Sequence, residues 1–467
     1  MAIARLDRHE VDLTKGPIFT MLIRFAVPFI IANVLSLLFQ VADVATLRFL
    51  VGGEAVGAVT STGPLTGLFI NFFIGFSAGA SVVLSRCVGE NDINKARRVV
   101  GTAISFSLIA GAFIMIVGWF GAETFLTWMD CPIELLPKAT SYVRIYFLGA
   151  PIILFYNLGA GMLRAVGDSL RPMIYLAISG IANVGLNVFF ILVCNMTVEG
   201  VAIGTVVSQL ISSILMFIAM RKSKGFSRLE FKYLKIYKKE LSDIVKIGLP
   251  TGIQSSLFSI SNILIQSTVN SFGPVAVEGS GAAGQVDGFI YVIGNAVGNS
   301  SMSFVSQNYG AKNVSRIKKV ILISTISVVI FQFLIGSLVY LLSRPILSLL
   351  IATEEAYFFA NQRLVIMLFF YFIEGVLEVL SLSLRAVGKS TTSMLISVIF
   401  VCVFRIVWLK TFFLLNPVPI MIFLSYPISW ILSNIAFLTV LVPLLKKLKI
   451  KFDKEKIESL EQTEVNV

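Results

Sequence analysis

Four acidic side chains stand inside long apolar stretches of the chain, at Asp43, Asp287, Glu374 and Glu378. If those stretches cross a bilayer, an ionisable residue at its centre costs about 2.5–3.5 kcal/mol on insertion scales, so such residues face a cavity or a partner. Exposed to lipid, the four would together cost on the order of 10 kcal/mol, comparable to the whole stability of a typical fold. We therefore expect all four to point inward.

Asp43 is a candidate for binding a proton or a cation such as Na⁺. It follows Leu38-Phe39-Gln40-Val41-Ala42 and has no basic residue within one helical turn. The alternative interpretation is an aspartate solvated near the outer end of its helix. Gln40, one turn earlier, is a candidate cavity residue.

Asn183 and Asn187 are four residues apart, so they project from one face of a helix. Side-chain amides can coordinate a hard cation through oxygen, or they can bind a neighbouring helix. Thr205 lies in a helix start rich in small residues, where its hydroxyl could join them. Taken alone, Thr205 would be interpreted as a packing residue.

Glu374 and Glu378 also share a helix face, and two carboxylates this close repel when both are charged. Arg405, inside a later apolar run, is the natural cation to lie between them. The group is either a proton site or an ion-pair cluster that stabilises its part of the protein. Arg405 is also a candidate substrate-binding residue.

Asp287 lies between Gln285 and Gly288 and could line a cavity. Asn262, Gln266 and Asn270, spaced four residues apart in an earlier run, could form a polar stripe opposite it. Such a stripe could equally serve only to hold helices together. We treat Asp287, Asn262 and Gln266 as candidate substrate contacts.

The elements that must position these residues are membrane helices. Hydrophobic residues make up 56% of the 467 residues and charged residues 14%, and the mean hydropathy is +0.88. A membrane helix needs about 20 mostly apolar residues. Twelve runs qualify: 18–50, 56–86, 96–120, 139–163, 170–194, 198–220, 244–272, 275–307, 317–343, 357–386, 390–415 and 418–446.

The twelve runs form two copies of one module. Leu163-Arg164-Ala165-Val166-Gly167 returns as Leu384-Arg385-Ala386-Val387-Gly388, 221 positions later. The sequence predicts an all-α membrane protein with two six-helix lobes, and transporters often place their sites between such repeats. The expected segments are an N-terminal segment 1–17, an N-lobe 18–220, a linker 221–243, a C-lobe 244–446 and a tail 447–467.

The basic residues predict the orientation, because cytoplasmic loops collect Lys and Arg. With the N-terminus inside, 31 of the 38 basic residues fall in cytoplasmic segments. The net charge of +12 is therefore a topology signal and does not indicate nucleic-acid binding. We expect both termini in the cytoplasm of a bacterium, and the basic linker 221–243 as an amphipathic helix on the inner leaflet.

The chain resembles the multidrug and toxic compound extrusion (MATE) family across nearly all of residues 14–446. The motifs that carry the resemblance are Pro28 and the span of Asp43, Gly89 ahead of Asn94-Lys95-Ala96, Leu163-Arg164-Ala165-Val166-Gly167-Asp168, Gly200-Val201-Ala202-Ile203-Gly204-Thr205, Gly248-Leu249-Pro250 and Gln307-Asn308-Tyr309-Gly310-Ala311.

The resemblance implies a twelve-helix exporter of cationic, aromatic drugs or toxins that exchanges them for H⁺ or Na⁺. It assigns a first-lobe cation site to Asp43, Asn183, Asn187 and Thr205, although one branch of the family has Asp where this chain has Asn187. The resemblance also matches Glu374 to an acidic residue that serves the second lobe in one branch of the family. Neither a cofactor nor an oligomer is implied, so the expected partners are a small molecule and membrane lipids.

Other functions fit the sequence less well. A flippase or exporter of lipid-linked or other amphipathic metabolites would line its cavity with more basic residues than Arg405 and Arg144. An enzyme would need a nucleophile with a base, or paired histidines, and His9 is the single histidine. A scaffold would have no need for four buried carboxylates.

Overall fold

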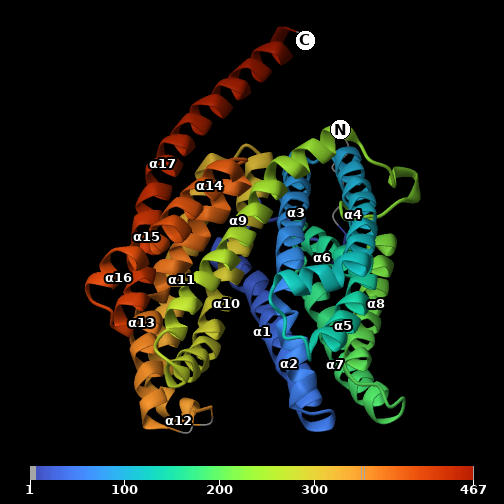
Figure 1. Ribbon diagram of the computed structural model, residues 1–467. Coiled ribbons are helices and arrows are strands. Elements are labelled where there is room, and N and C mark those ends of the chain that lie inside the picture. The colour runs from blue at the N-terminus through green and yellow to red at the C-terminus, as the bar shows by residue number, and fades with distance from the viewer. Residues whose placement is uncertain (1–6, 349, 352, 466–467) are drawn as a thin grey trace. The chain divides into compact units, whose positions relative to one another are not determined.

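The computed structural model describes residues 7–348, 350–351 and 353–465, and this part of the chain is helical without a strand. The first six residues of the expected N-terminal segment and the last two of the expected tail lie outside it. The helices, labelled in Figure 1, are α1 Ile18–Leu50, α2 Gly53–Ser61, α3 Gly63–Glu90, α4 Ile93–Trp128, α5 Leu136–Leu148, α6 Ala150–Ala165, α7 Leu170–Leu192, α8 Val198–Lys222, η1 Phe231–Tyr233, α9 Lys238–Asn270, α10 Pro274–Gly310, α11 Val314–Leu341, α12 Ser343–Leu347, α13 Glu354–Ala386, α14 Ser390–Ser397, η2 Val398–Val403, α15 Phe404–Lys410, α16 Phe412–Leu415 and α17 Pro419–Val465.

Within the described residues, nine helices are long and apolar enough to cross a membrane, or ten if the bent pair α5 and α6 counts as one span. The twelve predicted runs correspond to twelve helical stretches, of which α9 and α10 do not reach this hydropathy threshold. These two helices carry many Ser, Gly, Asn and Gln side chains. Helices of this polarity are expected to bury one face against other helices.

The chain divides into two compact units, and two of the boundaries between them fall inside helices. Unit 1 contains the residues through Asp12 and Val27–Ile253, and unit 2 contains Leu13–Ala26 and the chain from Gln254 onward. Two of the three boundaries therefore lie inside helices, in α1 beside Pro28 and in α9 beside Pro250, and the third, after Asp12, precedes α1. A proline inside a helix removes one backbone hydrogen bond and weakens the helix there. At these two weakened points the chain passes from one unit to the other.

Both units show the duplication in their backbones. Gly167 and Gly388, which end the repeated pentapeptide, have φ angles of +90° and +89°. The turns before α4 and α11 are also equivalent, because Asn91 and Lys312 have φ angles of 57° and 56°. In the next position an acidic or amide side chain caps the helix in each unit, through Asp92 and Asn313. The two-repeat prediction is thus confirmed at matching positions.

Glycines bring α3 and α9 into close contact within unit 1. A Cβ at Gly75 would overlap the backbone of Gly252, and one at Gly79 would lie 2.5 Å from the carbonyl oxygen of Ile244. Gly75 and Gly79 are four residues apart, as are Gly248 and Gly252, which is the small-residue spacing that lets membrane helices approach closely. The first half of α9 is fixed to unit 1 in this way.

The linker is not the predicted amphipathic helix. Between α8 and α9 the chain has a single 3-10 turn, η1. Its backbone is instead held by side chains of unit 1. Glu10 accepts hydrogen bonds from the backbone nitrogens of Phe226 and Ser227, at 3.1 and 2.9 Å, and Arg221 donates to the carbonyl of Leu229 at 2.9 Å. These contacts compete with helical hydrogen bonding and favour an extended path.

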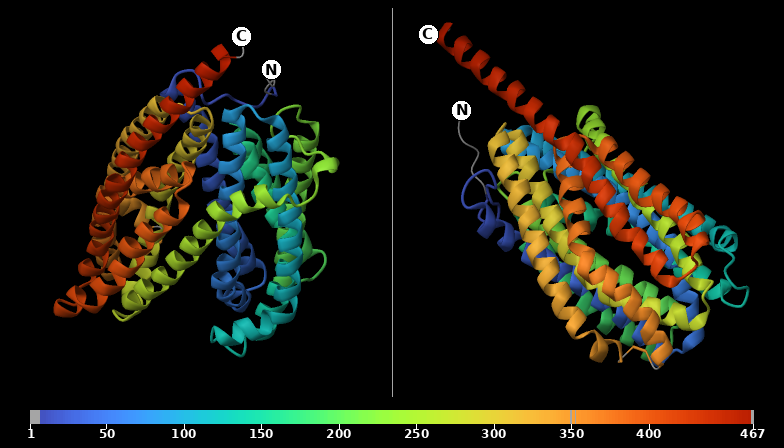
Figure 2. Two further views of the ribbon diagram at one scale, coloured as in Figure 1. Left: turned by 90° about the horizontal axis from the view of Figure 1, so that it is seen from above. Right: turned by 90° about the vertical axis from the view of Figure 1, so that its left-hand side faces the viewer.

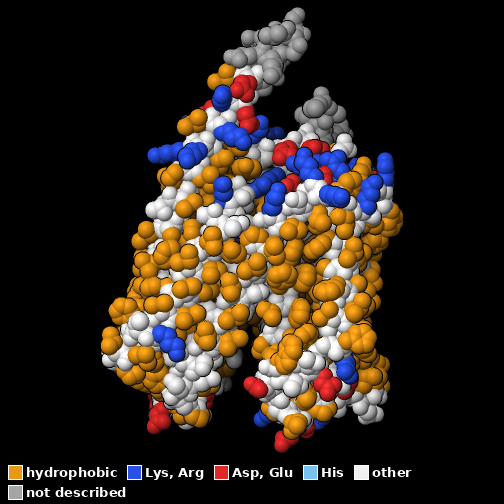
Figure 3. Space-filling view, turned by 45° about the horizontal axis from the view of Figure 1, so that its top comes forward, with side chains coloured by type: hydrophobic (Ala, Val, Ile, Leu, Met, Phe, Trp, Pro, Cys, Tyr) orange, Lys and Arg blue, Asp and Glu red, His pale blue; other side chains and the backbone are white. Residues whose placement is uncertain are grey.

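The surface of each unit matches a membrane protein. In Figure 3 hydrophobic side chains cover the flanks of the helices, and most Lys and Arg side chains gather at one end. The C-terminal part of α17 continues past the other helices of unit 2, as Figures 1 and 2 show. This part follows Pro443 and carries the basic residues of the tail from Lys446.

Candidate functional site

Unit 1 brings four predicted site residues together. Asp43 of α1 accepts a hydrogen bond from the Nδ2 atom of Asn187 on α7 at 2.6 Å. Asn183, one turn earlier on α7, donates to the Thr205 hydroxyl of α8 at 3.4 Å. Gln40 lies exposed on α1, and in the described part of the chain no hydrogen bond joins it to this group. We call Asp43, Asn183, Asn187 and Thr205 the unit 1 cluster.

Two oxygen atoms of the unit 1 cluster are buried without a partner. Asn187 is fully buried and Asn183 is 5% exposed. Among the described residues, the Oδ1 atom of neither amide has a hydrogen-bond partner. A buried polar atom without a partner costs about 1–3 kcal/mol, so these oxygens call for a ligand or water. Together with the Asp43 carboxylate and the Thr205 hydroxyl, they are oxygen donors of the kind that hard cations bind.

Close contact between α7 and α8 is what places Asn187. A Cβ at Gly204 would overlap the Asn187 Oδ1 atom, so glycine is required there for the amide to take this position. The Thr205 hydroxyl also donates to the carbonyl of Val201 at 2.9 Å, which leaves its lone pairs toward Asn183. The cluster therefore depends on the absence of a side chain at Gly204.

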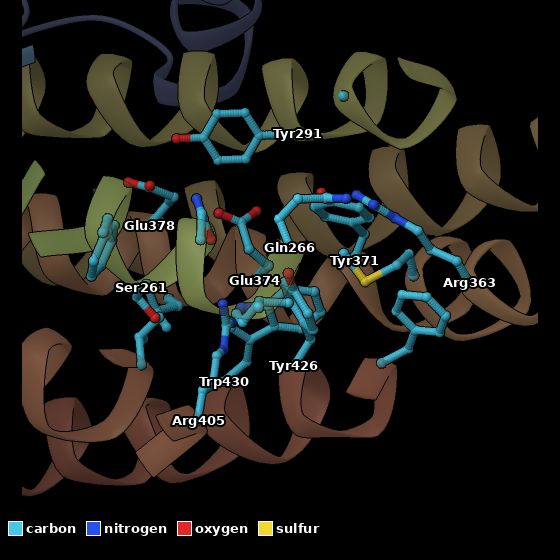
Figure 4. A pocket seen from close by; sticks show the side chains of 18 of the residues that line it. Ser261, Gln266, Tyr291, Arg363, Tyr371, Glu374, Glu378, Arg405, Tyr426 and Trp430 are labelled. Atoms are coloured by element: carbon cyan, nitrogen blue, oxygen red, sulfur yellow. The ribbon is translucent and has the colours of Figure 1, made fainter. Parts of the chain in front are cut away.

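Unit 2 holds a cavity of about 440 Å³ lined by predicted and unpredicted residues. Five predicted site residues line it: Asn262, Gln266, Glu374, Glu378 and Arg405. Figure 4 shows Glu374 and Glu378 of α13 and Arg405 of α15 around this space. On α9, Asn262 and Gln266 line this cavity, and the Gln266 amide donates to the Asn270 side chain of the same helix at 2.9 Å.

Asp287 does not line the cavity as predicted, because it is paired with an arginine that the sequence analysis missed. The Nε atom of Arg363 lies 2.8 Å from the Asp287 carboxylate, and its Nη1 atom donates to the backbone and the hydroxyl of Ser280 at 3.1 and 3.2 Å. Arg363 itself reaches the cavity wall. The available signal was a second arginine inside an apolar run, eleven residues before Glu374.

Glu374 is 6% exposed, and its Oε2 atom has no hydrogen-bond partner among the described residues. The side chain of Gln332 on α11 lies beside it, and glycine at 294 and at 375 makes room for both side chains. Glu378 is half-buried, and Tyr291 lies at the same cavity. The two carboxylates thus have different surroundings one turn apart.

Arg405 is not the ion-pair partner of these two glutamates. In the described part of the chain no carboxylate oxygen lies within 4.0 Å of its guanidinium. Its Nε atom donates to the Ser429 hydroxyl at 3.0 Å, and its guanidinium carbon lies 4.0 Å from the ring centroid of Tyr426. Arg405 therefore interacts with Glu374 only at longer range, and aromatic rings stack on its guanidinium.

Comparisons with known proteins agree with this architecture. The family model described as MatE matches residues 28–189 and 250–409, so its two matched segments coincide with the two repeats. The probable multidrug resistance protein YoeA of Bacillus subtilis is 28% identical over 396 residues, which cover 82% of this chain and 85% of YoeA. A protein named FAD transporter from Shewanella oneidensis is 24% identical and is covered over 87% of its length, with 84% of this chain.

Solved structures show the same fold. A multidrug resistance MATE family transporter of the MOP superfamily, in an outward-facing conformation, matches with a TM-score of 0.87 at 20% sequence identity. The match covers 95% of this chain and 99% of the transporter. Because the family model also covers more than half of the chain, in two segments that follow the internal repeat, this protein belongs to the MatE family of multi-pass membrane transporters.

Proposed function

We propose that this transporter exports cationic, amphipathic aromatic compounds from a bacterial cytoplasm in exchange for H⁺ or Na⁺. The observation that carries the proposal is the unit 1 cluster, where one carboxylate lies beside two buried amide oxygens that have no partner among the described residues. The names of multidrug resistance relatives support the drug-like substrate class. A carboxylate that is either bare or occupied by a cation gives the transporter two states with different substrate affinity.

The choice between H⁺ and Na⁺ rests on the oxygen donors around Asp43. A proton needs the carboxylate alone, whereas Na⁺ would also use the Oδ1 atoms of Asn183 and Asn187 and the hydroxyl of Thr205. The substitution of Asn for Asp at position 187, relative to one branch of the family, leaves the site with a single negative charge. A weaker cation site that exchanges its ion readily is the expected consequence.

The free energy needed for the conformational change favours a contribution of unit 2 to ion coupling. To change a conformational equilibrium from 1:99 to 99:1, ligands must supply about 5.5 kcal/mol of differential affinity. A tenfold difference in cation affinity between two states is worth about 1.4 kcal/mol. The unit 1 cluster alone would need a 10⁴-fold difference, so we include Glu374 and Glu378 as further coupling groups.

The test is efflux of ethidium from proteoliposomes, with a Na⁺ gradient and a pH gradient imposed separately. Wild type is compared with Asp43→Asn and with Glu54→Gln, a control that removes an exposed carboxylate of the same unit. Efflux driven by one gradient, lost in Asp43→Asn and kept in Glu54→Gln, supports the proposal and names the ion. If neither gradient drives efflux in wild type, the proposal fails, and amphipathic metabolites become the next substrates to test.

The same proposal includes a monomer in the cytoplasmic membrane with both termini inside. The loop after α7 is then outside the cell, and it contains Cys194, an exposed free cysteine. In a Cys131→Ser background, a membrane-impermeant maleimide added to intact cells should label Cys194 fully. Labelling only after the cells are opened would reverse the proposed orientation.

A further inference from the structure

Arg405 is a buried cation whose hydrogen-bonding capacity is largely unused. It is 4% exposed and lies at the wall of the unit 2 cavity. Its Nε atom donates to Ser429, but within the described residues nothing accepts a hydrogen bond from its two terminal nitrogens. Since buried charges are normally paired, a guanidinium left in this state calls for a ligand of opposite charge.

The local backbone aims this side chain at the cavity. Arg405 is the second residue of α15, which follows the π-helical segment η2 without a break. π-helical turns insert extra residues into a helix, shift the face that the following residues present, and occur frequently at functional sites. Figure 4 shows Arg405 reaching from its helix toward the space between Trp430 and Glu374.

Aromatic rings cover the flat side of the guanidinium and leave its edge free. The guanidinium carbon lies 4.0 Å from the ring centroid of Tyr426 and 5.9 Å from that of Trp430. Stacking stabilises the charge without using the N–H groups, which lie in the guanidinium plane. The free edge presents two parallel donors, the arrangement that binds a carboxylate or a phosphate in a bidentate manner.

Arg363, at the same cavity, serves as an internal comparison. Its charge is balanced by Asp287, and its nitrogens donate to that carboxylate and to Ser280. Arg363 is therefore committed to holding α10 and α13 together. Arg405 forms no direct ion pair in the described structure and interacts with Glu374 only at longer range, so its terminal nitrogens are available to a ligand.

Negative charge faces the same space from α13. Glu374 has an Oε2 atom without a partner among the described residues, and Glu378 lies one turn further along the helix. A cavity of about 440 Å³ falls in the range of small-molecule sites. Aromatic walls with a cation at one place and carboxylates at another match a ligand that carries both charges.

We propose that the unit 2 cavity binds an aromatic substrate that carries an anionic group, a carboxylate or a phosphate, held by the guanidinium of Arg405 beside Tyr426 and Trp430. A cationic or hydrogen-donating group of the same substrate faces Glu374 and Glu378. The inference rests on the proposed export function, whose substrate class it extends from cations to amphoteric and anionic aromatic compounds. The competing explanation is that Arg405 only balances the charge of the glutamates.

The experiment is equilibrium binding to the purified transporter in lipid nanodiscs, followed by fluorescence anisotropy. Two pairs of fluorescent probes differ only in the anionic group: tetramethylrhodamine with its free carboxylate against its methyl ester, and riboflavin 5′-phosphate against riboflavin. The proteins are wild type, Arg405→Gln, Arg405→Lys and Lys410→Gln, a matched control that removes an exposed positive charge from the same helix. Circular dichroism and elution profiles establish that each variant is folded.

We expect wild type to bind the anionic member of at least one pair about tenfold more tightly than its neutralised partner, because charge-assisted bidentate bonds are the strong ones. Arg405→Gln should remove this preference and leave the affinity for the neutralised partner within about threefold. Arg405→Lys should keep part of it, since a lysine supplies the charge without the planar fork. The pair with the larger Arg405-dependent difference identifies a carboxylate or a phosphate as the preferred group.

Three results would overturn the inference. One is an Arg405→Gln variant that weakens both members of each pair equally, as expected if Arg405 only balances the glutamates. Another is the absence of any preference in wild type, and the third is an equal loss in Lys410→Gln, which would indicate general electrostatics. Binding is measured without an ion gradient, so a failure of gradient-driven efflux would be recognised separately.

Discussion

The two units share their backbone turns but not their polar residues. At the repeat offset of 221 positions, Asp43 corresponds to Leu264, and Glu374 corresponds to Ile153. Unit 1 has a small cluster with one carboxylate, whereas unit 2 has a cavity of about 440 Å³ with two glutamates and Arg405. The duplication thus preserved the backbone of the module, whereas the polar site residues differ between the two copies. We infer that the unit 1 cluster serves mainly the coupling ion and the unit 2 cavity mainly the substrate.

This division predicts unequal effects of removing one carboxylate from each unit. Asp43→Asn should lower the initial rate of gradient-driven efflux at least about 100-fold, since the cluster has no second charge to replace it. Glu374→Gln should lower it about tenfold, because Glu378 remains in the cavity. The rates are measured in proteoliposomes at equal protein content. The reverse ranking would place coupling in unit 2 and remove the division.

By contrast, the stability of the two units should be equally sensitive to Gly→Ala substitutions at close helix contacts. A Cβ at Gly75 of unit 1 would overlap the backbone of Gly252, and one at Gly279 of unit 2 would overlap the carbonyl oxygen of Ala356. Each Gly→Ala substitution should lower the free energy of unfolding by about 2–3 kcal/mol, within the range for overpacked sites.

The controls for this packing experiment are Gly185→Ala and Gly281→Ala, where a Cβ would meet nothing within 4 Å. These should leave stability unchanged or raise it slightly, as alanine favours helix. Denaturant unfolding in detergent followed by tryptophan fluorescence measures all four variants. A large loss of stability in one unit alone would show that close helix packing is required in that unit and not in the other.

A smaller effect is expected within the unit 1 cluster. Asn187→Ala removes the donor that lies 2.6 Å from the Asp43 carboxylate, and a hydrogen bond to a charged group is worth about 1.5–3 kcal/mol. Cation-driven efflux should fall about tenfold while ethidium binding stays unchanged, since the substrate site is assigned to unit 2. A parallel loss of ethidium binding would indicate that the cluster contacts substrate directly.

The smallest effect concerns the N-terminal segment outside the membrane. Burial tends to raise the pKa of Asp7, but hydrogen bonds from the backbone nitrogens of Lys224 and Arg8 outweigh it and lower the pKa below its usual value of 3.8. The stabilisation is therefore present above that value and is lost as the pH falls through the lower pKa of the folded state. Asp7→Asn should lower the melting temperature slightly at pH 7, and the difference should shrink progressively as the pH falls below 3.8. A difference that stays constant over this pH range would exclude this charge as the cause.

Much of the fold could be predicted from the sequence. Apolar runs and basic loops define the helices, and the repeated pentapeptide reveals the duplication with its positive-φ glycines at 167 and 388. Spacing also predicted that Asn183 and Asn187 share one face of a single helix, whereas their grouping with Asp43 and Thr205 was implied only by the family resemblance. In both cases the signal is local, since periodicity and spacing along one helix determine which side chains share a face.

The remaining features depend on contacts between distant segments. The pairing of Asp287 with Arg363 joins two helices whose register no local pattern reports, so Asp287 was assigned to the cavity. The aromatic stacking of Arg405 depends on η2, and a π-helical segment has no clear sequence signal. The linker also departed from its prediction, because its conformation is fixed by Glu10 far away in sequence.

The change of unit inside α1 and α9 has a consequence for how such a protein could arise. Each unit contains the beginning of the first long helix of the other repeat, since Leu13–Ala26 belongs to unit 2 and the first half of α9 belongs to unit 1. A half-length chain could not complete a unit with its own residues. A single-copy ancestor would have functioned as a homodimer that exchanged half-helices, and gene fusion would have turned that reciprocal exchange into the covalent link of one chain.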